Sequence, residues 1–112
     1  MTQRRVIALL AVLATAVAGC GGADSAPVAT TKVSMAKSYR FSPKVIDVAA
    51  GSTVTWTNDD NFTHTIRFDD EDETAELEPG DTFEHEFDEA GSFHYICTLH
   101  PQDMEGEVRV GQ

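Results

Sequence analysis

Seven short segments rich in β-branched and aromatic residues follow one another through most of the chain, and turn residues separate them. The segments are 33–36, 44–48, 52–58, 64–68, 82–87, 92–97 and 107–110, and the clearest turns are Ala50-Gly51, Pro79-Gly80-Asp81 and Ala90-Gly91. Within 52–58, threonines alternate with Val54 and Trp56, as in a strand with one buried face. No amphipathic helix of convincing length is apparent. The pattern predicts an all-β fold, an antiparallel Greek-key β-sandwich or barrel.

The size and charge of the chain exclude several classes of protein. A length of 112 residues allows one small domain and excludes a large multi-domain enzyme. A formal net charge of −11 argues against nucleic acid as a partner, because phosphate binding needs a basic face. The same charge disfavours docking on anionic lipid through a polybasic patch.

The N-terminal segment has the pattern of an export signal. Arg4-Arg5 precedes an apolar run over residues 6–18, which is shorter than the ~20 residues of a membrane-spanning helix. The run ends in Val17-Ala18-Gly19-Cys20, which resembles the lipobox of bacterial lipoproteins. We therefore predict cleavage before Cys20 and lipidation of Cys20. A plain secretory signal with an incidental cysteine is the alternative, and Arg4-Arg5 lacks the residues that flank a twin-arginine signal.

These features divide the chain into three parts. Residues 1–19 are predicted to be a signal peptide, residues 20–31 a lipidated cysteine with a flexible tether, and residues 32–112 the folded domain. Removal of residues 1–19 leaves 6 basic against 19 acidic residues, a net charge of −13. The predicted location is extracytoplasmic, with a lipid anchor in the cell membrane.

Four side chains form a candidate copper site. Cys97, His100 and Met104 lie within eight residues, in a loop between two predicted strands, and His64 begins a strand 33 positions upstream. Two imidazoles, one thiolate and one thioether are the ligands of a blue-copper centre. The soft sulfur ligands favour Cu(I) and imidazole accepts both oxidation states, so one electron can arrive with little rearrangement.

Each of these residues also has an ordinary structural interpretation. A lone cysteine at a strand end is commonly a small buried apolar residue, and a lone methionine commonly fills the core. Zinc is the nearest rival metal, but methionine is a poor zinc ligand. Cysteine catalysis would need oxyanion donors that nothing in the chain indicates. The order and spacing of the four residues on an all-β pattern favour one type 1 copper.

Most of the predicted domain resembles the cupredoxins of the plastocyanin, amicyanin and halocyanin-like group. The resemblance runs through residues 39–43, 51–58, 64–66, 79–80, 87, 91–97, 100–101 and 104–108. It implies that His64, Cys97, His100 and Met104 bind copper and that the protein carries single electrons between redox proteins. Three residues separate His100 from Met104, against two in amicyanins and four in plastocyanins. Thr65 stands where many relatives have asparagine, and its hydroxyl is expected to hydrogen-bond across to the cysteine loop.

The remaining histidines and the acidic loop receive other interpretations. His94 lies three residues before Cys97 and is expected to face away from the metal. His85 is expected to be structural and partly buried beside Phe83 and Phe87. The acidic run 69–73 is either a solvated turn or a docking surface for a basic partner.

Three functions compete at this point. The first is a membrane-tethered blue-copper electron carrier, not an enzyme, monomeric, with redox proteins as partners and a membrane contact through its lipid. The second is a copper-binding or copper-delivery lipoprotein without an electron-transfer role. The third is an interaction domain that has lost its metal, which the presence of all four ligand residues disfavours.

Overall fold

A computed structural model describes residues 26–111. It contains ten strands: β1 (Val28–Ala29), β2 (Lys32–Ala36), β3 (Arg40–Ser42), β4 (Val45–Ala49), β5 (Ser52–Asn58), β6 (His64–Phe68), β7 (Ala75–Leu77), β8 (Thr82–Phe87), β9 (Gly91–Ile96) and β10 (Glu105–Gly111). All seven predicted segments are strands, with bounds shifted by two residues at most. The predicted signal peptide and lipobox lie outside the described residues.

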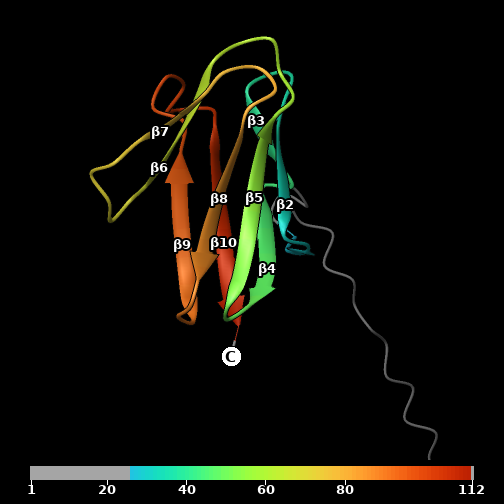
Figure 1. Ribbon diagram of the computed structural model, residues 1–112, viewed down its shortest axis with the longest axis vertical. Coiled ribbons are helices and arrows are strands. Elements are labelled where there is room, and N and C mark those ends of the chain that lie inside the picture. Colours follow the sequence, from blue (N-terminus) through green and yellow to red (C-terminus); the bar gives the residue numbers. More distant parts are fainter. Residues whose placement is uncertain (1–25, 112) are drawn as a thin grey trace, which may run out of the picture.

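The strands form two sheets that pack face to face (Figure 1). One sheet has the order β1-β4-β10-β9-β6-β7 and the other has the order β3-β2-β5-β8. The predicted all-β sandwich is therefore confirmed. The sheets are mixed, however, because β4 pairs in parallel with both β1 and β10, and β2 pairs in parallel with β5. These three parallel pairs depart from the antiparallel pairing that the sequence predicts.

The first strand changes the predicted start of the folded part. Val28 pairs with Ile46 and Ala29 with Asp47, so β1 belongs to the larger sheet. The sequence predicts a tether at these two residues, because two residues are too few to show an alternating pattern. Among residues 26–111, no helix is long and apolar enough to cross a membrane.

The core lies between the two sheets and is rich in aromatic rings. Val54 and Trp56 of β5 are fully buried while Thr53 is exposed, as the alternation predicts. The Trp56 ring meets the edges of Phe68 and Tyr95, with centroids 5.9 and 5.4 Å away. This packing joins the smaller sheet to β6 and β9 of the larger one, the two strands that carry His64 and precede Cys97.

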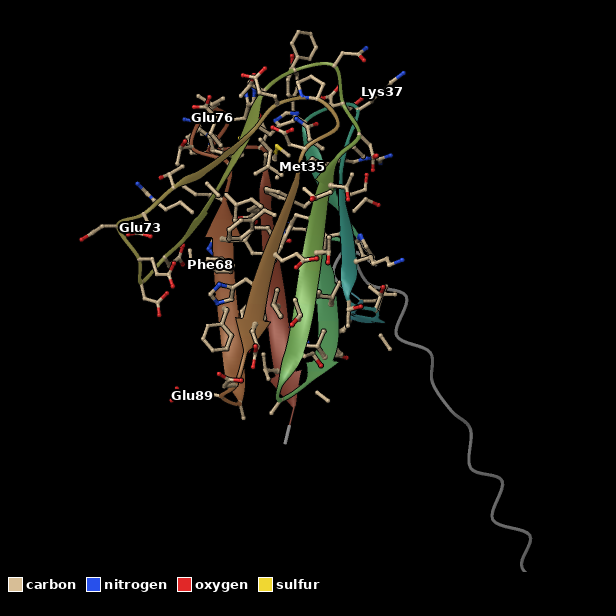
Figure 2. The ribbon with its side chains drawn as sticks, in the orientation of Figure 1. Met35, Lys37, Phe68, Glu73, Glu76 and Glu89 are labelled. Atoms are coloured by element: carbon tan, nitrogen blue, oxygen red, sulfur yellow. The ribbon has the colours of Figure 1, made fainter. Side chains whose placement is uncertain are left out.

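Loops from both sheets gather at one end of the sandwich (Figure 1). They are the loops β2–β3, β5–β6, β7–β8 and β9–β10. Figure 2 shows Lys37 at this end and Glu89 at the opposite end, while Glu73 lies on the β6–β7 hairpin, which projects sideways. The candidate ligand residues belong to the gathered loops and the strand ends beside them.

Candidate metal centre

The β9–β10 loop is closed on itself by backbone hydrogen bonds. The Cys97 N–H donates to the Met104 carbonyl at 3.0 Å, and the Met104 N–H donates to the His100 carbonyl at 2.9 Å. Both sulfur-bearing side chains are fully buried. The loop therefore brings Cys97 and Met104 together at the end of the buried core and leaves His100 nearer the surface.

His64 opens β6 and is also fully buried. Its Nδ1 lies 3.8 Å from Cys97 Sγ, although the two residues are 33 positions apart. Its Nε2 lies 2.9 Å from a carboxylate oxygen of Asp60. An ionised carboxylate only accepts hydrogen bonds, so Nε2 carries the ring proton and Nδ1 presents its lone pair toward the sulfur.

His100 is half-buried at the rim of this group. Its ring centroid lies 5.9 Å from that of His64 and 4.2 Å from that of Tyr39, against which it packs. Across residues 26–111, no three His, Cys, Asp or Glu side chains converge as a ready-made metal cluster. The structure thus brings His64 and Cys97 into contact and buries Met104 beside them. The ring of His100 lies next to the ring of His64, nearer the surface.

Hydrogen bonds around Cys97 favour its thiolate. Burial raises the pKa of this thiol, but hydrogen bonds from the N–H and hydroxyl of Thr65 and from the N–H of Leu99 hold the pKa below its usual value. The Thr65 N–H lies 3.4 Å from Sγ and its hydroxyl 3.6 Å. The Thr65 hydroxyl also accepts from the Thr98 N–H at 2.7 Å. Thr65 therefore makes the bridge to the cysteine loop that the sequence predicts.

These donor atoms fit a copper ion. An imidazole nitrogen at ~2.0 Å and a thiolate sulfur at ~2.3 Å from one trigonal ion are about 3.7 Å apart, close to the 3.8 Å between His64 Nδ1 and Cys97 Sγ. The buried thioether of Met104 supplies the weak soft donor that distinguishes copper from zinc sites.

The comparisons with known proteins agree with this geometry. Residues 6–110 match the family described as the cupredoxin-like domain. The chain belongs to the cupredoxin family. Amicyanin-alpha of Methylorubrum extorquens is 35% identical over 112 residues, covering 92% of each chain. Chloroplastic plastocyanin of Tetradesmus obliquus is 34% identical over 109 residues, covering 85% of this chain and 75% of its own.

Solved structures of cupredoxins share the fold. The purple cupredoxin of Nitrosopumilus maritimus superposes with a TM-score of 0.64 at 32% identity, over 71% of this chain and 98% of its own. A reduced amicyanin variant gives 0.65 at 29% identity, over 71% of this chain and 80% of its own. Amicyanin and plastocyanin are electron carriers and not enzymes, and type 1 copper is the cofactor typical of these relatives. This cupredoxin is accordingly a blue-copper protein of the same kind.

The other two histidines lie outside the metal centre, as expected. His94 faces outward, with its Nδ1 2.8 Å from Asp69 and its Nε2 3.1 Å from Glu105. His85 is half-buried, and its ring lies 4.6 Å from that of Phe87 and 6.4 Å from that of Phe83.

Two residues beside the candidate ligands were not predicted to contribute to the site. Asp60 precedes His64 by four positions, a spacing that could have indicated a carboxylate partner for the imidazole. Tyr39 comes from the β2–β3 turn, and its ring lies 6.0 Å from His64 as well as against His100. Nothing in the local sequence indicates that this turn reaches the metal centre.

An apolar surface surrounds His100. Phe62 and Leu99 are 57% and 53% exposed, and Tyr39 is 38% exposed. Tyr39 lies 6.0 Å from Phe62, centroid to centroid. Exposed large apolar side chains gathered at one place indicate an interaction surface. We refer to Tyr39, Phe62 and Leu99 as the apolar rim.

Proposed function

We propose that this cupredoxin is a membrane-tethered electron carrier in which His64, Cys97, His100 and Met104 hold one copper ion. The observation that carries the proposal is the buried pair of His64 Nδ1 and Cys97 Sγ, 3.8 Å apart. Copper bound there would accept and return one electron by alternating between Cu(II) and Cu(I).

The surrounding residues have distinct roles in this proposal. Thr65 lowers the pKa of the Cys97 thiol and fixes its position, because it donates hydrogen bonds to Sγ and accepts one from the Thr98 N–H. The closed 97–104 loop limits rearrangement of the ligands between oxidation states. His100 is the half-buried ligand, so its outer edge is the shortest path from the centre to a partner, and the apolar rim keeps that path dry.

A copper-delivery role is the competing function. Delivery needs a site from which the ion can exchange, whereas Cys97, Met104 and His64 have no exposed surface. Voltammetry of the copper-loaded protein, followed by incubation with a Cu(I) chelator, separates the two roles. A carrier gives a reversible one-electron wave and keeps its copper over many turnovers. Rapid loss of copper to the chelator, without a reversible wave, would establish delivery instead.

The tether and the location belong to the same proposal. The sequence Val17-Ala18-Gly19-Cys20 supports cleavage before Cys20 and lipid attachment there, which would hold the domain on the extracytoplasmic face of a membrane. Redox partners would then lie in or at the same membrane. Mass spectrometry of the protein from the membrane fraction tests this: a mature chain starting at an acylated Cys20 is expected, and an unmodified Cys20 or another start would refute the anchor.

A further inference from the structure

The buried carboxylate of Asp60 contacts His64, the first proposed ligand, on the side of its ring that faces away from Cys97. Asp60 is 6% exposed, and its Oδ2 accepts a hydrogen bond from His64 Nε2–H at 2.9 Å. Within residues 26–111, Asp60 forms no ion pair with a lysine or arginine; His64 is its close charged or chargeable partner, and Lys37 adds only the weakest of the interactions that lower its pKa. The negative charge of Asp60 therefore acts mainly on the imidazole.

The loop that carries Asp60 is built to hold it in this place. The side-chain amide of the buried Asn58 donates to the carbonyls of Phe62 at 2.8 Å and Leu77 at 2.9 Å. The side-chain oxygen Oδ1 of Asn58 accepts a hydrogen bond from the backbone N–H of Asp60 at 3.0 Å. The second oxygen of Asp60 accepts the Asn61 N–H at 2.7 Å. Both carboxylate oxygens are thus occupied and the carboxylate cannot turn away from His64.

A backbone carbonyl in this place would fix the ring equally well, since it also accepts the Nε2 proton. A carboxylate adds a full negative charge at hydrogen-bond distance from a metal ligand, in a site that excludes water. Such a charge makes the imidazole a stronger metal ligand and stabilises Cu(II) relative to Cu(I).

We propose that Asp60 is a positioning residue that holds His64 in the Nε2–H tautomer and, through its charge, lowers the reduction potential of the copper. This inference rests on the proposed ligand role of His64. Asp60 would then shift this carrier's preference toward Cu(II).

The test compares Asp60→Asn with Asp59→Asn. Asparagine at position 60 still offers an oxygen to Nε2–H but has no charge. Asp59 is the exposed neighbour, bonded to Ser34, and its substitution removes the same charge one residue away. We expect Asp60→Asn to change the ratio of Cu(II) to Cu(I) affinity at least tenfold in favour of Cu(I), a rise of about 59 mV for one electron. Asp59→Asn is expected to change the potential far less.

A second readout uses the metal-free protein. Nitrogen NMR shifts of the His64 ring are expected to show a protonated Nε2 in the parent chain and in Asp60→Asn. In Asp60→Ala, where the acceptor is missing, a mixture of tautomers is expected. Equal potentials for Asp60→Asn and Asp59→Asn, or a protonated Nδ1 in the parent protein, would overturn the inference. If Asp60→Asn fails to fold, the Asp60→Ala spectrum and the parent spectrum still decide the tautomer.

The outcome also separates this inference from the proposed function. If His64→Ala keeps the full absorption of the copper-loaded protein, His64 is not a ligand and the proposed function fails together with the inference. If that absorption is lost in His64→Ala but Asp60→Asn leaves the potential unchanged, only the role of Asp60 fails.

Discussion

Thr65 shows how one side chain connects the two loops of the metal centre. Its hydroxyl contacts Cys97 Sγ and accepts from the Thr98 N–H, and its own N–H also points at the sulfur. The hydroxyl also lies 2.7 Å from the Thr98 hydroxyl, so its removal affects both the thiol and the cysteine loop.

Thr65→Val is expected to raise the pKa of the Cys97 thiol, since one of the donors to the sulfur is lost while the Thr65 N–H remains. The unsatisfied Thr98 N–H is expected to cost about 1–3 kcal/mol of unfolding free energy. Ultraviolet titration of the thiolate in the metal-free protein and urea unfolding measure the two effects. Thr65→Ser retains the hydroxyl and is the control. A thiol pKa unchanged in the valine variant would show that the backbone donor alone is sufficient.

The sequence predicts the bridge from Thr65 because the residue directly follows a candidate ligand and has one polar group to place. It does not predict the contact of Asp60 with His64. That contact depends on the path of residues 59–63, which Asn58 fixes through hydrogen bonds to Phe62 and to Leu77 on another strand. Long-range hydrogen bonds of this kind leave no periodic signal.

At the scale of strands, β9 and β10 are joined by a close approach at Gly106. Gly106 pairs with Tyr95 in the register, and a Cβ at this position would overlap the end of the Tyr95 ring. Tyr95 is fully buried between the sheets, so its ring has no free space into which to move. Position 106 therefore needs glycine, because the Tyr95 ring fills the space that a side chain at position 106 would occupy.

Gly106→Ala is therefore expected to lower the unfolding free energy by about 1–3 kcal/mol through overpacking. Gly111→Ala on the same strand is the matched control, because a Cβ there would meet only a carbonyl oxygen at 3.7 Å. Chemical denaturation of the two variants measures the difference. Equal stabilities would mean that β10 can shift away from Tyr95 at little cost.

His94 of β9 joins the β6–β7 loop to β10. Hydrogen bonding to Asp69 raises the pKa of His94, partial burial opposes this, and hydrogen bonding to Glu105 adds to the rise. A raised pKa in the folded state means that the protonated histidine stabilises the fold. This contribution is complete below the unfolded value of about 6.5 and is lost as the pH rises through the higher folded pKa.

The pH dependence of unfolding tests this role. Compared with His94→Gln, the parent protein is expected to lose stability as the pH rises from about 6.5 upward, by less than about 1 kcal/mol because the groups are exposed to solvent. Urea unfolding of both proteins across this range gives the difference. A difference that stays constant with pH would exclude a charged His94 from the fold's stability.

The strands themselves were largely predictable. All seven predicted segments have either alternating or continuous apolar residues between turn residues, and each is a strand. The three missed strands, β1, β3 and β7, have two or three residues each, too few to establish a period. The parallel pairings were also missed, because local patterns give the face of a strand and not its neighbour.

At the scale of the whole molecule, the acidic loop and the apolar rim lie on different parts of the surface. Figure 2 places Glu73 on the projecting β6–β7 hairpin, away from the loops that surround His100. We therefore expect the loop to act on the encounter with a basic partner, and the apolar rim to act on transfer within the complex.

Leu99→Glu is expected to slow transfer within the complex at every salt concentration, because a charge at the rim keeps the partner and its electron path hydrated. Stopped-flow kinetics with the native partner measures this. Transfer at the parent rate would show that the rim does not form the contact.

Replacing Asp70, Glu71 and Asp72 by their amides is expected to lower the association rate roughly tenfold at low salt and flatten its salt dependence. Asp69 is kept because it binds His94. Amide replacements of Glu86, Asp88 and Glu89 remove the same charge elsewhere and serve as the control. An association rate that rises with added salt would show that the partner is not basic.

The central claim is that Cys97 binds Cu(II) as a thiolate beside His64. The visible absorption spectrum of the purified protein loaded with Cu(II) tests it most directly. We predict an intense thiolate-to-copper band, absent in Cys97→Ser and retained in Met104→Leu, whose thioether tunes the ion and does not hold it. A colourless Cu(II)-loaded protein in which Cys97 remains reduced would contradict the account.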